Sequence, residues 1–176
     1  TCLHGDLRAN TPVRRGSCSR LDLPSNDLPL TRLGANTVFR FARGTRNLEL
    51  TEGAILLQAP KGAGGARIRT AAITAAITGT TVMMEHHRGG ESKFIVLEGK
   101  ARVALAGSNE WKEVKAGEMV TAGPDQKKLS DPFEVDLSPL IASSLLVTDF
   151  ATLPSLDLIR QPIRQQPQRT RGRTIP

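Results

Sequence analysis

The sequence is poor in aromatic residues and contains no long apolar run. Phenylalanine, tryptophan and tyrosine make up 3% of the 176 residues, with one tryptophan and no tyrosine. A buried core must therefore be built from isoleucine, leucine, valine and alanine. No apolar run approaches the roughly 20 residues that a membrane-spanning helix needs. The length suits one domain of ordinary size with tails.

Cysteine is nearly absent as well, with Cys2 and Cys18 as the two thiols of the chain. A disulfide between them would close a loop of about 17 residues and would contribute about 3 kcal/mol in the chain-entropy picture. One close pair is weak evidence of a disulfide framework. Two unpaired thiols in a polar leader are therefore the alternative interpretation.

Acidic residues are missing from the C-terminal end, where positive charge collects. The net charge is +7, yet without the five tail arginines the chain holds 19 basic against 17 acidic residues. The near-neutral body does not indicate a folded surface for nucleic acid. The tail is either a solvated linker, which we favour, or an electrostatic arm for anionic polymers. Its arginines are Arg160, Arg164, Arg169, Arg171 and Arg173.

From Thr37 onward, short runs rich in β-branched and aliphatic residues alternate with breaks at glycine, a pattern typical of an all-β domain. After Gly99, Ala101 and Val103 alternate with polar residues, so they should face the core. Residues 71–78 suit either helix or strand by composition, and we interpret them as a strand. The expected strands are 37–42, 47–51, 54–58, 66–70, 73–78, 81–86, 93–98, 100–106, 111–115 and 118–122.

Glycines at 53, 79, 99 and 117 punctuate these runs at loosely regular spacing, which is reminiscent of a solenoid. After Pro124 the β pattern ends. Ser138–Phe150 is a candidate short helix, with Ser138 as its cap and Pro139 in its first turn. From Pro154 onward proline, glutamine and arginine dominate, so this tail is expected to be disordered. The expected organisation is a leader at 1–9, a β domain at 10–123, an extension with the helix at 124–153 and the tail at 154–176.

Catalytic and metal-binding patterns are missing from the sequence. His86 and His87 are adjacent, and neighbouring side chains on a strand face opposite ways, so they cannot chelate one ion. Glu85 and His87 could share a face, but two ligands do not make a structural metal site. Serine-nucleophile and phosphate-loop motifs are not found. We predict no catalytic, cofactor-binding or metal-binding residue, and therefore no enzyme.

Four short segments nevertheless occur in an order that resembles the FecR family. They are Ile68–Thr70, Ala75–Thr80, Val96–Val103 and Lys115–Glu118. The resemblance covers about residues 10–123. It implies structural roles for glycines at chain corners and for threonines that hydrogen-bond to neighbouring backbone. The structural motif residues are Thr70, Gly79, Thr80, Glu98, Gly99, Gly117 and Glu118.

The resemblance implies an all-β fold, a β-solenoid-like or sandwich-like stack of short strands, here with one short C-terminal helix and a disordered tail. It also implies a periplasmic or secreted location and a non-catalytic role in envelope signalling or protein–protein recognition. The expected partner is another envelope protein, bound at strand edges or at the helix. The alternatives are a structural module of the cell surface that associates with polysaccharide, and nucleic-acid binding through the arginine tail.

Overall fold

The computed structural model describes most of the chain from Leu30 to Gln166. The ranges are 13–14, 21–23, 30–41, 45–59, 61–62, 64–148 and 153–166. Cys2 and Cys18 lie outside the described residues, so their pairing stays a prediction. The tail arginines at 169, 171 and 173 lie outside them too.

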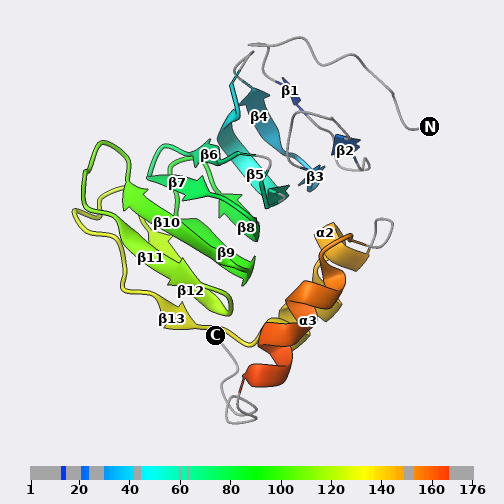
Figure 1. Cartoon of the computed structure of the whole chain (residues 1–176). Helices are drawn as coiled ribbons and strands as arrows, with labels where there is room; N and C mark the ends of the chain where they lie inside the picture. Colours follow the sequence, from blue (N-terminus) through cyan, green and yellow to red (C-terminus); the bar gives the residue numbers. More distant parts are fainter. Residues whose placement is uncertain are drawn as a thin grey trace.

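Within the described residues, thirteen strands join one curled sheet (Figure 1). The curl gives the sheet two halves, and the long strand β5 (Asn47–Ala59) belongs to both. Half A also contains β1 (Val13–Arg14), β4 (Val38–Phe41), β6 (Ala66–Arg69), β7 (Ile73–Ile77), β10 (Lys100–Leu105) and β11 (Lys112–Lys115). Half B also contains β2 (Leu21–Leu23), β3 (Leu30–Leu33), β8 (Thr80–His86), β9 (Ser92–Glu98), β12 (Glu118–Ala122) and β13 (Phe133–Glu134).

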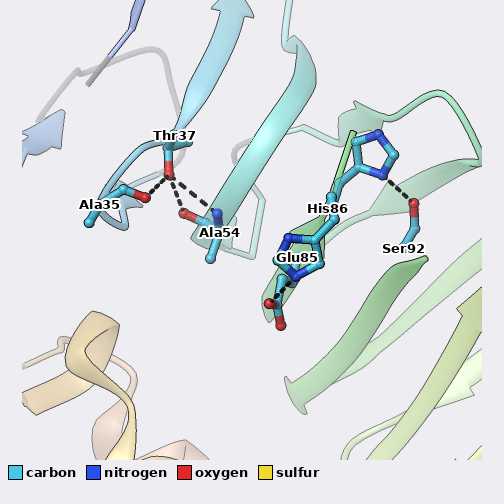
Figure 2. Close-up of polar contacts among 7 residues, drawn as sticks. Ala35, Thr37, Ala54, Glu85, His86 and Ser92 are labelled. Carbon is cyan, nitrogen blue, oxygen red and sulfur yellow. Dashed lines mark hydrogen bonds and ion pairs between the residues drawn. The ribbon is translucent and has the colours of Figure 1, made fainter. Parts of the chain in front are cut away.

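Strand β5 changes partners near Gly53. Its first residues pair with β4 and β6, and its last residues pair with β3 and β8. Gly53 has a φ of 102°, and a Cβ there would collide with the side chain of Thr37. Thr37 Oγ1 instead accepts from the Ala54 amide at 3.2 Å and lies 3.1 Å from the Ala54 carbonyl oxygen (Figure 2). The glycine therefore lets β4 and β5 approach closely where β5 crosses from one half to the other.

The two halves bury a common aliphatic core on the inner side of the curl. Strand β7 shows the period of two that this requires, because Ile73, Ala75 and Ile77 are buried while the residues between them are half-buried. The core joins residues of half A to residues of half B. Its central members are Leu48, Ile68, Ala75, Val103 and Val114 from half A, and Ile55, Val82, Phe94, Val96 and Val120 from half B.

Three later connections also cross between the halves, and each does so at a glycine with positive φ. The crossing from β7 to β8 contains Gly79, at a φ of 61°, and the crossing from β9 to β10 contains Gly99, at 82°. The crossing from β11 to β12 contains Gly117, at 86°. Residues other than glycine rarely adopt a positive φ, so these crossings occur where the sequence has a glycine.

A layer of short helices covers the outer face of half B (Figure 1). It consists of α1 (Leu137–Ser143), α2 (Leu145–Thr148) and α3 (Leu156–Gln165). Their apolar side chains pack on Leu56, Ile95 and Leu97, which point away from the main core. The layer thus forms a second, smaller core with half B.

The all-β class is confirmed, and so is the interpretation of 71–78 as a strand, β7. The expected strands 47–51 and 54–58 form one continuous strand, β5. Before Thr37 the described residues contain β1, β2 and β3; brief strands or extended segments around Leu21 and Leu23 were expected, and β2 (Leu21–Leu23) is one of them. The finer choice between a solenoid and a sandwich stays a prediction.

The short C-terminal helix region is confirmed, and three details of the C-terminal residues differ from expectation. The helix expected at 138–150 is divided into α1 and α2, and its cap is Asp136, whose carboxylate accepts from the Ser138 amide at 3.0 Å. The tail expected to be disordered from Pro154 contains α3. Composition misled here, because the few apolar side chains of this segment recur at helical spacing and bury one face of it. They are Leu156, Ile159 and Ile163.

We expect Gly99→Ala to destabilise the protein more than Gly107→Ala. The two glycines have nearly equal φ, 82° and 81°, so the cost of a left-handed alanine, about 1–2 kcal/mol, is shared by both variants. A Cβ at Gly99 would lie 2.8 Å from the Gly79 carbonyl oxygen, whereas one at Gly107 meets nothing within 4 Å. Overpacking should therefore cost Gly99→Ala about 1–3 kcal/mol more. Urea unfolding measures the difference, and equal losses would contradict the close approach.

Candidate functional site

The motif residues around Gly79 and Gly99 form one compact structure in which two chain corners pack together. Thr80 Oγ1 donates to the Lys100 carbonyl oxygen at 2.8 Å, which ties the β7–β8 corner to the β9–β10 corner. Gly99 lies directly against the Gly79 carbonyl, since no Cβ intervenes. These motif residues therefore join the backbones of the two chain corners.

The β11–β12 corner is the anchor of the helix layer. Glu118 Oε2 accepts from the Lys115 amide at 2.7 Å and closes the turn around Gly117. The Gln166 side chain, at the end of α3, lies where a Cβ on Gly117 would be. Its amide donates to the Val135 carbonyl at 2.6 Å and accepts from the Leu137 amide at 3.2 Å. The corner thus fixes both ends of the helix layer.

Glu98, the remaining acidic residue of the motif, lies beside the β8 residue Thr81. Thr81 Oγ1 is 3.3 Å from Glu98 Oε2 and 2.9 Å from Ser155 Oγ. Ser155 immediately precedes α3 and is buried. A chain of polar contacts therefore runs from the family motif to the helix layer.

Thr70, His86 and Ser92 form a buried polar chain between the two halves. Thr70 Oγ1 accepts from the amides of Ala72 and Ile73 at 3.1 and 3.0 Å. It is also 3.1 Å from Ser92 Oγ, which lies 2.8 Å from His86 Nδ1 (Figure 2). The chain links the turn before β7 to strands β8 and β9, so its first role is structural.

His86 is 3% exposed, and burial lowers the pKa of its imidazole below the usual 6.5. The neighbouring His87 lowers this pKa further, while the carboxylate of Glu52 raises it by less. The neutral form of His86 is therefore favoured in the folded protein. According to its tautomer, a neutral ring either accepts a hydrogen bond from the Ser92 hydroxyl or donates one to the Ser92 oxygen.

Glu85 and His87 share a face, as expected, and His86 points to the other side of β8. Glu85 Oε1 lies 2.8 Å from His87 Nε2, and both side chains are well exposed. Among the described residues no group of three or more histidine, cysteine, aspartate or glutamate side chains could hold a metal ion. Glu85 and His87 therefore form a surface pair.

Sequence reasoning missed Arg32, which is buried on β3 beneath the helices. Its side chain is 1% exposed, and Nη1 donates to the Leu146 carbonyl oxygen at 3.2 Å. The residue ties β3 to α2, far along the chain. No sequence signal could have shown this, because a lone arginine is ordinarily exposed.

The comparison with protein families decides what this scaffold is. The model described as "FecR protein" matches residues 11–102, more than half of the chain. The chain is a member of the FecR family. The resemblance expected from sequence is thereby confirmed, although the Lys115–Glu118 segment lies beyond the matched residues. No curated protein matches the chain.

Two crystal structures resemble this FecR chain, both from Parabacteroides distasonis ATCC 8503 and both of proteins assigned as anti-sigma factors. One, at 1.65 Å resolution, is 17% identical with a TM-score of 0.63, covering 75% of this chain and 63% of that one. The other, at 2.50 Å, is 16% identical with a TM-score of 0.64, covering 78% and 65%. At 16–17% identity, this similarity shows that the fold is shared. This chain matches less than two thirds of either protein's length.

The helices of this FecR chain are short. Of those within the described residues, none combines the length and the apolar character that crossing a membrane requires.

We expect Thr70→Val to destabilise the protein by about 1–3 kcal/mol, because valine matches the shape of threonine but leaves buried amides of Ala72 and Ile73 unpaired. Thr70→Ser keeps the oxygen and loses one methyl group, so it should cost about 1 kcal/mol or less. Urea denaturation of both variants tests this. A valine variant as stable as the serine variant would show that the hydroxyl contributes little.

Stability should fall as the pH drops below about 6.5, the usual pKa of histidine. The folded pKa of His86 is lowered, so the unfolded chain binds the proton first and gains from it. The contribution of His86 is therefore complete above pH 6.5 and is lost as pH falls toward the lowered pKa. Thermal unfolding of the wild type and of His86→Gln across this range measures the effect.

The matched control for that experiment is His87→Gln. It removes the smaller cause of the shift and leaves burial, the larger one, in place. Its pH dependence should stay close to the wild type, while that of His86→Gln becomes flatter. The same slope in His86→Gln and wild type would exclude His86 as the source.

Proposed function

We propose that this FecR-family chain is a non-catalytic regulatory module that acts in envelope signalling by recognising another protein. The observation that carries the proposal is that the chain belongs to the FecR family while its motif side chains are engaged in holding the scaffold. Thr70 and Glu118 accept from backbone amides, and Thr80 donates to a backbone carbonyl. Such groups supply geometry and leave recognition to the surface.

The likeness of the fold to two proteins assigned as anti-sigma factors supports a signalling role. A periplasmic or otherwise extracytoplasmic location is part of the proposal and follows from the family. Nothing in the buried polar chain of His86, Ser92 and Thr70 requires a substrate, since its hydroxyl groups and ring bond to one another and to backbone. We therefore propose that regulation proceeds by binding.

The surface offers features that suit a protein partner. The described large apolar side chains that are exposed are Phe133 on β13, Leu145 on α2 and Leu158 on α3, at 43%, 66% and 42%. Leu145 and Leu158 belong to the helix layer, and β13 is the strand at one end of the sheet order. Exposed apolar side chains and free strand edges are both used in protein recognition.

Deleting the gene that encodes this chain should change the transcription of a defined set of genes, and supplying the full gene product should restore it. Leu145→Asp combined with Leu158→Asp should fail to restore, because charges on the helix layer oppose apolar docking. Lys127→Ala with Lys128→Ala, on an exposed loop, should restore fully. Transcript sequencing measures the effect, and cell fractionation should place the protein outside the cytoplasm.

Unchanged transcription after deletion would contradict a regulatory role. Full restoration by the aspartate variant would contradict the helix layer as the docking surface. Retention of the purified chain on cell-wall glycan, without any transcriptional effect, would favour the structural cell-surface alternative. Salt-sensitive DNA binding that is lost on truncation after Leu158 would favour the nucleic-acid alternative.

A further inference from the structure

The outer face of half A carries basic side chains, which we call the basic groove. The helix layer packs on half B instead (Figure 1). Strand β6 alternates strictly, so that Ala66 and Ile68 are buried and Arg67 and Arg69 point outward. Strand β10 alternates in the same way at its start, with Lys100 and Arg102 exposed. Four cations therefore project from two strands on the same face.

Strand β7 lies between those two strands and gives the groove its floor. Ala76 pairs with both Arg67 and Arg102, and Thr74 pairs with Arg69. The residues that β7 presents on this face, Thr74 and Ala76, are small. Because neighbouring strands lie about 4.8 Å apart, the basic side chains of β6 and β10 are roughly 10 Å from each other, with the small side chains of β7 between them.

One end of the groove deepens into a hollow of about 360 Å³. Two glycines keep it open: a Cβ on Gly64 would lie 2.9 Å from Arg46 Nη1, and one on Gly65 would lie 3.0 Å from Thr78 Oγ1. A side chain at either position would displace the Arg46 or the Thr78 side chain that lines the hollow. The hollow is lined by Arg46, Asn47, Gly65, Arg67, Ala76 and Thr78, with Ala66 and Ile77 beneath them.

Basic side chains outnumber acidic ones at the groove, where Glu113 on β11 lies opposite Arg102 and Glu49 on β5 lies opposite Arg69. Among the described residues, the salt bridge at this face joins Lys100 to Glu113 at 3.2 Å, and no carboxylate pairs with Arg46, Arg67 or Arg69. The Arg102 guanidinium lies 5.4 Å from the ring centre of Trp111, which holds it over the sheet. An anion entering the groove would therefore meet guanidinium groups with free donors.

We propose that the groove binds an extended segment of a partner protein that carries aspartate or glutamate at alternate positions. The proposal names the partner chemistry of the proposed function and rests on it. Side chains on one face of an extended peptide repeat about every 6.8 Å, and so do Arg67 and Arg69, or Lys100 and Arg102, along their strands. Guanidinium groups bind carboxylates with two parallel hydrogen bonds. The small floor residues leave room for the peptide backbone.

Single-stranded nucleic acid fits the same face less well. Bases need open aromatic faces for stacking, and Trp111 is already engaged with Arg102. The domain without its tail is also close to neutral. These observations favour carboxylates of a peptide over phosphates of a nucleic acid.

Fluorescence anisotropy with a labelled peptide of five Glu-Thr repeats tests the proposal on the full chain. A second peptide with the same composition but with its glutamates in one block is the control for spacing. We expect the alternating peptide to bind several-fold more tightly than the block peptide. We expect Arg67→Ala with Arg102→Ala to weaken its binding about tenfold or more, because two charge-assisted contacts are lost.

Lys127→Ala with Lys128→Ala removes the same charge from an exposed loop elsewhere and should change the affinity less than about twofold. Arg67→Lys with Arg102→Lys keeps the charge without the paired donors and should bind with intermediate affinity. Circular dichroism checks that each variant is folded. These outcomes together would support a carboxylate groove with defined spacing.

Equal affinity for the two peptides, or an equal loss in the loop variant, would overturn the proposal by showing non-specific attraction. Tighter binding of heparin or of oligothymidine than of the alternating peptide would overturn it in favour of a glycan or nucleic acid. Tighter binding of the alternating peptide, together with unchanged transcription after deletion of the gene, would refute the proposed function alone. Regulation that survives while the chain binds no peptide would refute the groove alone.

Discussion

The close packing of two chain corners is the constraint on which the rest of this structure depends. Gly99 lies against the carbonyl of Gly79, and Thr80 donates across the same junction to Lys100. The chain crosses between the sheet halves at both corners, so a Cβ at Gly99 would force the two corners to shift apart. The common core inside the curl is closely packed, so a shift of the corners would disturb its packing.

The inner core leaves two outer faces, and the chain treats them in opposite ways. One face is apolar at Leu56, Ile95 and Leu97 and is covered by helices that the Gly117 corner anchors. The other face carries Arg67 and Arg102 and stays open. In a single curled sheet, one outer face can therefore pack against helices and stabilise the fold, while the other stays exposed and can bind a partner.

Most of the β domain was predictable from the sequence, because period-two burial and glycine corners are local signals. Ala101 and Val103 face the core as their alternation indicates, and Gly79 and Gly99 turn the chain where expected. Helix α3 was not predictable from composition, since its stability depends on Ile159 meeting the surface of half B. The continuity of β5 could not be predicted, because a glycine usually indicates a turn. Gly53 instead lies inside the strand, where the strand passes from half A to half B.

The candidate site shows the same division between local and tertiary information. The motif residues that the sequence singled out hold the scaffold together. Lys100 and Arg102 of the groove lie within the same motif segments, but their side chains point outward and have no assigned role in the motif. Arg67 and Arg102 come together only because both strands pair with β7, a register that no local pattern reveals. Arg67 and Arg102 are exposed, and substitutions at exposed positions usually change stability by less than about 0.5 kcal/mol. A FecR scaffold can therefore keep its corners while the outward side chains of half A set the partner that each chain selects.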